Sequence, residues 1–118
     1  MPLVTICALP PPEPSRIDTM LGAVVRAVAS TLERRPEDVW ARFEAVTHAH
    51  SGDGRERWDA QHPIVTVTTR KQPHDVVERT LRAVTDAVAA GFGIEQEAVW
   101  GRWVTLVDDT VFSNGKLT

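Results

Sequence analysis

The chain has 118 residues, of which 42% are hydrophobic and 25% charged, with a formal net charge of -3. This length and composition predict one globular domain with a single core. Acidic and basic residues are interspersed, without the basic stripe that neutralises phosphates, so we expect no nucleic-acid partner. Since Cys7 is the sole cysteine and no cationic leader or long apolar run is present, we expect a cytoplasmic chain that is neither secreted nor inserted in a membrane.

A proline directly behind the initiator methionine opens the first predicted strand, which runs from about Leu3 to Ala8. Removal of Met1 would make Pro2 a free secondary amine. Such an amine titrates near neutral pH, with a reference pKa of about 7.7 to 8.0 that apolar burial or a nearby cation lowers, so it can serve as a general base. Proline makes up about 5% of average sequence, so its position alone leaves coincidence open.

A helix and a second strand follow. Prolines within residues 10–14 exclude helix there, and the helix is predicted from Ser15, as its N-cap, to about Glu33, because apolar residues recur every three or four positions. The second strand is predicted over 39–46, and its two faces alternate. One face carries Trp40, Arg42 and Glu44, and the other carries Phe43 and Ala45. This strand-helix-strand unit predicts parallel strands joined by a right-handed crossover.

The second half of the chain repeats the first. The segment PLVTI at 2–6 matches PIVTV at 63–67 at an offset of 61 residues, and VWARF at 39–43 matches VWGRW at 99–103 at an offset of 60. The repeat predicts a strand over 64–69, a helix over about 74–90 with glycines near its end, and a strand over 99–107. We therefore expect a single domain, 1–118, with β-α-β units at 2–46 and 63–107 and a C-terminal hairpin or tail at 108–118. Residues 47–62 would join the units as a hairpin or an oligomer contact.

These features together resemble the tautomerase superfamily, which includes 4-oxalocrotonate tautomerase, malonate semialdehyde decarboxylase, the 3-chloroacrylic acid dehalogenases and macrophage migration inhibitory factor. The resemblance rests on the start MPLVTI, on the tandem β-α-β units and on VFSNGKL at 111–117, which is similar to the family's aromatic-then-glycine hairpin. It implies an α+β fold with a four-stranded sheet and two helices on one face, assembled as a homotrimer. It also implies a cofactor-independent tautomerase acting on small 2-oxo or unsaturated carboxylic acids, with Pro2 as catalytic base or acid.

Arginines hold the substrate carboxylate in this family, because a planar and permanently charged guanidinium suits that group. The best match is Arg70, directly after the third predicted strand, although Lys71 and Gln72 follow where longer members usually carry a second arginine. Arg16 is an equal choice between a ligand and a solvated helix start.

Three further residues are substrate-binding candidates by the same resemblance. Arg42 and Arg102 repeat near the strand arginine of the short members, displaced by two residues, and an ion pair with Glu44 or a subunit contact is their alternative role. Phe112 resembles the hairpin aromatic that closes the pocket, with core packing as its alternative. Pro63 matches Pro2 in the repeat, but its nitrogen is a tertiary amide, so we expect it only to open a strand.

Other site chemistries have less support. His48 and His50 are two residues apart, but no further ligand completes a zinc site, so we expect no metal. Asp108 and Asp109 would activate water, as an acidic residue does in the dehalogenase and hydratase branches, or lie in a solvated hairpin. A dehalogenase, hydratase or decarboxylase of small three-carbon acids therefore stays open, as does a non-catalytic trimeric binding protein if Met1 is retained.

The expected trimer needs an apolar second face on the sheet. We predict that Val65, Val67, Phe43 and Trp103 contribute to that face. The remaining tryptophans of the two repeats are expected in the core or at an interface.

Overall fold

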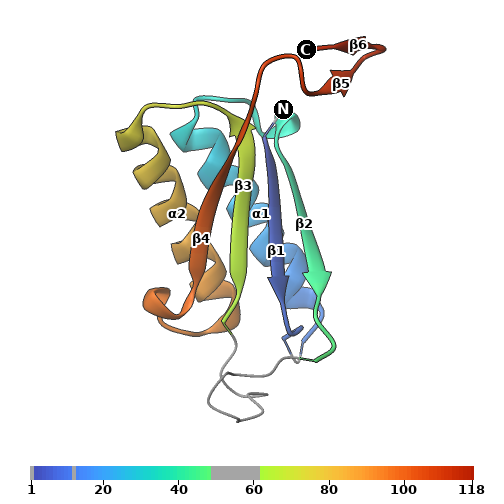
Figure 1. The fold of residues 1–118 in the computed structure, drawn as a ribbon. Helices are drawn as coiled ribbons and strands as arrows, with labels where there is room; N and C mark the ends of the chain where they lie inside the picture. The colour runs from blue at the N-terminus through green and yellow to red at the C-terminus, as the bar shows by residue number, and fades with distance from the viewer. Residues whose placement is uncertain (1, 12, 49–61) are drawn as a thin grey trace.

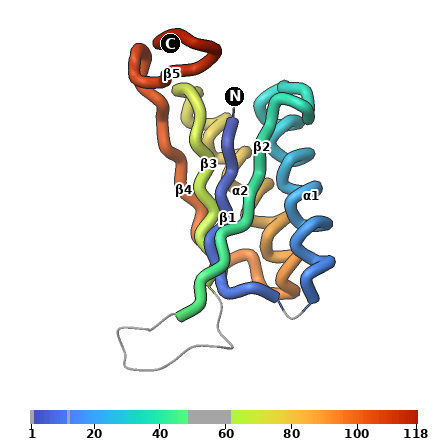
Figure 2. Tube along the Cα trace, turned by 90° about the vertical axis from the view of Figure 1, so that its right-hand side faces the viewer, coloured from blue at the N-terminus to red at the C-terminus, as the bar shows by residue number. Residues whose placement is uncertain are grey.

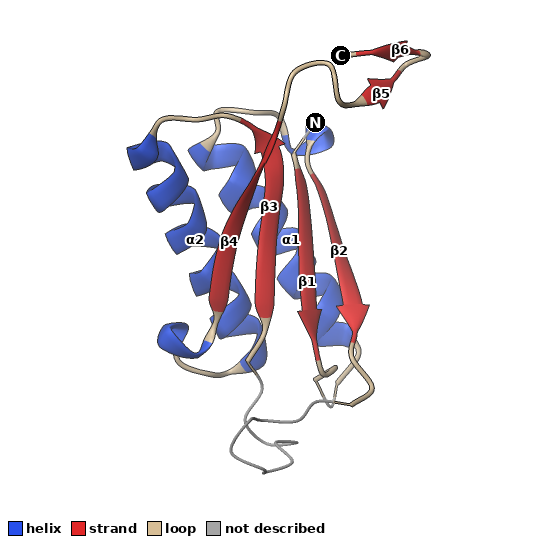
Figure 3. Cartoon of the chain, viewed as in Figure 1, coloured by secondary structure: helices blue, strands red, loops and turns tan. Residues whose placement is uncertain are grey.

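The computed structural model describes residues 2–11, 13–48 and 62–118. It has two layers, a four-stranded sheet and two antiparallel helices that cover one of its faces (Figures 1 and 3). In chain order the elements are β1 Leu3–Ala8, α1 Ser15–Thr31, η1 Pro36–Asp38, β2 Trp40–Ala45, β3 Ile64–Arg70, α2 His74–Phe92, η2 Gln96–Ala98, β4 Trp100–Leu106, β5 Phe112–Ser113 and β6 Lys116–Leu117. The predicted α+β fold class is therefore confirmed. The expectation for 47–62 falls largely on residues outside those described.

The prediction that Ser15 caps the first helix is wrong. Ser15 is the first helical residue and Pro14 is the N-cap, with a φ of -58° that already suits a helix start. The second helix ends at Gly93, whose φ of 68° lies in the left-handed region that glycine tolerates.

The sheet order is β2-β1-β3-β4. Each β-α-β unit pairs its own strands in parallel, and the two units meet through antiparallel β1 and β3. Leu3 lies opposite Thr68 in that central pair. The start of β1 therefore lies beside the end of β3. Both are at the end of the sheet where the amino terminus and the C-terminal segment are found (Figure 1).

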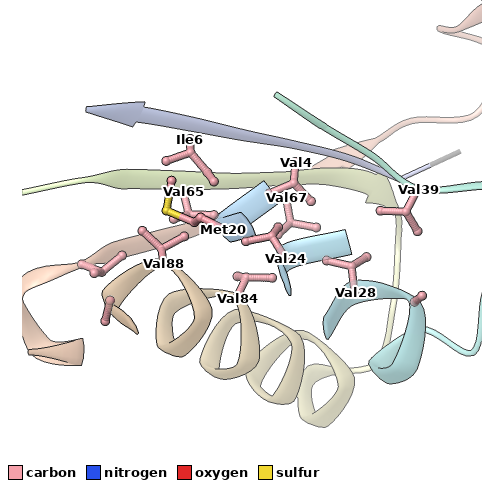
Figure 4. Packing of buried hydrophobic residues seen from close by; sticks show 13 residues of the cluster. Val4, Ile6, Met20, Val24, Val28, Val39, Val65, Val67, Val84 and Val88 are labelled. Atoms are coloured by element: carbon pink, nitrogen blue, oxygen red, sulfur yellow. The ribbon is translucent and has the colours of Figure 1, made fainter. Parts of the chain in front are cut away.

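The core lies between the sheet and the helices. Figure 4 shows valine and isoleucine side chains of β1 and β3 packed toward apolar residues of both helices. Val65 and Val67 are fully buried there, and Phe43 and Trp103 are half-buried against the same cluster. Their predicted place on the second face is wrong, because the register sets Val65 opposite Ile6 and thus on the helix side.

The described helices and loops leave the sheet's other face uncovered (Figure 1), and we call it the open face. Its residues form three rows across the strands: Trp40, Leu3, Thr68 and Val104; Arg42, Thr5, Thr66 and Arg102; Glu44, Cys7, Ile64 and Trp100. The β5–β6 hairpin extends beyond the end of the sheet, clear of both layers (Figure 2). Within the described residues, neither helix has the length and apolar character needed to cross a bilayer.

Candidate active site

Pro2 lies at the end of the sheet and is fully buried. Its carbonyl oxygen accepts a hydrogen bond from the N–H of Trp40 at 3.0 Å, which joins the starts of β1 and β2. On the other side of β1, Leu3 pairs with Thr68 of β3. Extending this register by one residue places Pro2 opposite Thr69, which is also buried. The residue after Thr69 is Arg70, so a single chain brings Pro2 and Arg70 to the same end of neighbouring strands.

Arg70 is held by the C-terminal segment. Its Nη1 donates to the carbonyl oxygen of Val107 at 3.2 Å, and its Nη2 donates to Oγ1 of Thr118 at 3.2 Å. The carboxylate of Asp108 lies 3.5 Å from Nη1. The Asp108 side chain is 95% exposed and that of Arg70 is 34% exposed, so water screens this ion pair and it contributes little to stability.

The other predicted arginines lie away from Pro2 within the chain. Arg16 is in the first turn of α1, at the opposite end of the sheet, and pairs with Glu13 at 3.5 Å. Arg42 and Arg102 lie midway along the two edge strands on the open face. Arg42 pairs with Glu44 on its own strand at 3.4 Å, while Nε of Arg102 donates to Oγ1 of Thr66 at 2.9 Å.

Phe112 lies on the projecting hairpin, and its side chain is 74% exposed. Among the described residues, Phe112 belongs neither to the hydrophobic core cluster nor to the lining of a groove between α2 and β4. The tryptophans that begin β2 and β4, Trp40 and Trp100, are also exposed, at 59% and 68%, on the open face.

The far end of the sheet has the same backbone arrangement as the Pro2 end, but different side chains at the matching positions. Pro63 is fully buried and directly precedes β3, as predicted, and its carbonyl accepts the N–H of Trp100 at 2.9 Å. The repeat counterpart of Arg70 is Leu9, which is buried. The counterparts of Pro2 and Arg70 at this end, Pro63 and Leu9, therefore supply neither an amine nor a cation.

An additional ion pair lies at the Pro2 end. Nε and Nη2 of Arg35 donate to the two carboxylate oxygens of Asp38, at 3.1 and 3.2 Å, where η1 leads into β2 (Figure 3). The Arg35 hydrogen bond lowers the pKa of Asp38, and the same bond raises the pKa of Arg35. Sequence reasoning missed this pair, although the spacing of three residues across Pro36 could have indicated it.

Two other kinds of site are suggested by the surface or by the sequence, a groove and a metal site, and neither includes Pro2 or Arg70. A shallow groove of about 470 Å³ runs between α2 and β4 and contains none of the predicted site residues; it is lined by His74, Val77, Glu78, Leu81, Arg82, Thr85, Gln96, Val99 and Gly101. Over the described ranges, no three His, Cys, Asp or Glu side chains are grouped as metal ligands. His50 lies outside those ranges.

No protein-family model matches the chain, and no curated protein does. Solved structures match over nearly the whole chain, and each of the three described next covers 98% of it. Pt0534 inactivated by 2-oxo-3-pentynoate is 14% identical, with 94% of its chain covered and a TM-score of 0.86. An asymmetric trimer of wild-type R7 fused 4-OT is 10% identical, with 94% covered and a TM-score of 0.87. Macrophage migration inhibitory factor of Toxoplasma gondii is 13% identical, with 99% covered and a TM-score of 0.75. At these identities the likeness shows the fold, which is the tautomerase fold that the resemblance implied.

Proposed function

We propose that the chain is a cofactor-independent tautomerase that moves a proton on small 2-oxo or unsaturated carboxylic acids, with Pro2 as general base and acid once Met1 is removed. The observation that carries this proposal is the position of Pro2, fully buried at the start of β1 beside the strand that ends at Arg70. The likeness in fold to fused 4-OT and macrophage migration inhibitory factor supports it.

Burial suits Pro2 to the role of a base. Desolvation penalises the ammonium form of an amine, so we expect the pKa of the prolyl amine to fall below the reference of about 7.7 to 8.0. An amine that is largely neutral near pH 7 accepts a proton without first losing one.

The reaction then needs two proton transfers. The neutral prolyl nitrogen takes a proton from the hydroxyl of an enol substrate, or from the carbon next to the carbonyl of a 2-oxo substrate. The electron pair of the broken O–H or C–H bond stays on the substrate as the enolate. Arg70 stabilises the charge on the carboxylate and enolate oxygens. The prolyl ammonium returns the proton to a different substrate atom, which restores the amine.

Arg70 has capacity for this role. A guanidinium carries five N–H donors, and the contacts with Val107 and Thr118 leave donors free. Because the Asp108 contact is long and exposed, a substrate carboxylate can replace it.

The wider proposal includes assembly and location. We propose a homotrimer, supported by the uncovered sheet face and by the fused 4-OT neighbour described as a trimer. We also propose a cytoplasmic location for the chain.

The experiment tests the amine and the turnover together. Intact mass of the cell-made protein should lack Met1, and 2-oxo-3-pentynoate should add to the chain by forming a bond between the prolyl nitrogen and its alkyne carbon. Wild-type protein should turn over phenylenolpyruvate or 2-hydroxymuconate, and Pro2→Ala should abolish most of this turnover while the protein stays folded. Retention of Met1 in the whole population, or unchanged turnover by Pro2→Ala, would refute the mechanism.

A second candidate is a hydratase or dehalogenase of three-carbon acids. The observation that favours it is the Asp108 carboxylate beside Arg70, where an acid could activate water for attack on a bound substrate. Asp108→Asn should abolish hydration of such a substrate but leave proton transfer on phenylenolpyruvate intact. Loss of both activities, or of neither, contradicts this candidate.

A further inference from the structure

Two edge strands of the sheet carry opposite charges that cannot meet within one chain. Glu44 lies on β2 and Arg102 on β4, with β1 and β3 between them. Both side chains lie on the open face, in neighbouring rows. Among the described residues, neither edge strand has a partner strand on its outer side, and backbone hydrogen-bonding groups left open in this way favour association with another chain.

The two halves of the open face are equivalent in backbone but not in charge. Arg42 and Arg102 occupy matching positions, and Arg42 pairs with Glu44 at 3.4 Å. The position that matches Glu44 in the second half is Val104, so Arg102 forms no ion pair with any described residue and is held only through Thr66. Glu44 is the only carboxylate among the residues that define the open face.

Large aromatic side chains flank these charges. Trp40 and Trp100 lie at diagonally opposite corners of the open face, each more than half exposed, and Ile64 and Val104 add exposed apolar surface. Tryptophan and arginine are enriched in protein interfaces, and an exposed apolar face on a monomer marks an interaction site. The open face therefore has the composition of an interface.

We propose that the occupant of this face is a second copy of the chain, placed head to tail so that Arg102 of one copy pairs with Glu44 of the next. This contact sets the β4 half of one copy against the β2 half of its neighbour. Each copy then offers one half to each neighbour, which lets the contact close into a ring. The pairing gives Arg102 the carboxylate that its own half lacks.

The inference rests on the homotrimer proposed above, but it adds a specific charge pair to it. Glu44→Arg and Arg102→Glu should each raise the dissociation constant of the assembly at least about tenfold, since each sets like charges opposite one another. The double variant restores opposite charges and should recover association. Sedimentation velocity over a concentration series measures this, and circular dichroism checks that each variant is folded.

A matched control comes from an exposed ion pair on the helix layer. Glu78 and Arg82 lie 3.2 Å apart on α2, and both side chains are exposed. Reversing either charge there should leave association unchanged. An equimolar mixture of Glu44→Arg and Arg102→Glu chains should associate more tightly than either variant alone.

The outcomes separate this inference from the proposed function. An assembly that tolerates both single reversals, or that the double variant fails to recover, refutes the Arg102–Glu44 pair while leaving the trimer in place. A wild-type chain that stays monomeric at micromolar concentration refutes both the Arg102–Glu44 pair and the homotrimer. The open face would then bind a partner of another kind. Turnover is not the readout, so loss of activity in Pro2→Ala does not affect the result.

Discussion

Nη2 of Arg70 donates a hydrogen bond of 3.2 Å to Oγ1 of Thr118, across 48 residues of sequence. Thr118 is itself held by Val111, through backbone hydrogen bonds in both directions. The end of β3 and the C-terminal segment are therefore joined through the side chain that we propose as the carboxylate anchor. Substrate binding and the position of this segment should be coupled.

Arg70→Ala tests that coupling. We expect kcat/KM for carboxylated substrates to fall about ten- to a hundredfold, because a charge-assisted contact in a partly desolvated site is lost. Backbone amides of 111–118 should also exchange hydrogen faster, because the hydrogen bond to Thr118 is lost. Arg79→Ala, on the exposed face of α2, is the control and should change neither measurement. Unchanged kinetics for Arg70→Ala would move the anchor to Arg16, Arg42 or Arg102.

The charge of Asp38 should depend on Arg35. The Arg35 hydrogen bond lowers the pKa of Asp38 from its ordinary value of 3.8. Because the folded-state pKa is the lower one, the pair stabilises the fold above the unfolded pKa, and this contribution is lost as pH falls through the folded pKa. NMR titration of the Asp38 carboxyl should give a higher pKa in Arg35→Ala than in the wild type. Equal values in both proteins would show that the pair does not persist in solution.

Each chain should offer one reactive amine. Pro63 is an internal residue and Leu9 occupies the position that matches Arg70, so the far end of the sheet should not react. We expect 2-oxo-3-pentynoate to label one site per chain, as counted by intact mass, and peptide mapping should place it at Pro2. Pro63→Ala should keep the full label, whereas Pro2→Ala should lose it. A second adduct that disappears in Pro63→Ala would contradict this stoichiometry.

The close approach of the helices at Gly91 should resist substitution. A Cβ atom built there lies 2.8 Å from Cγ and Sδ of Met20 and 2.9 Å from its Cβ, so Met20 must shift. At Gly22 on α1 the nearest atom is Nη1 of Arg26 at 3.4 Å, the end of a flexible side chain.

Chemical denaturation separates the two glycines. Gly22→Ala should raise the free energy of unfolding by about 0.5 to 1 kcal/mol through helix propensity. Gly91→Ala has the same propensity gain but should lower the free energy of unfolding by about 1 to 3 kcal/mol, because overpacking outweighs it. Equal gains at both positions would mean that the helices are not packed this closely.

Local patterns in the sequence predicted the elements well. Apolar residues spaced by three or four gave both helices, and the repeat gave the second β-α-β unit from the first. Where a local detail failed, as at Ser15, the cause was also local, since Pro14 already has the backbone angles of a helix start. A helix or strand depends mainly on residues close in sequence, so these features are visible without a fold.

The arrangement of the site was decided by the tertiary structure. Alternation along β3 separates Val65 from Thr66 but does not say which side faces the helices, and only packing against both helices assigned it. No local pattern predicted the antiparallel pairing of β1 and β3, which sets Pro2 beside the strand that ends at Arg70. Strand order depends on contacts between residues far apart in the chain, because the core is buried only when all four strands form one sheet against the helices. The sequence by itself therefore determined the candidate base and its strand, while the tertiary structure decided which charges lie at its end of the sheet.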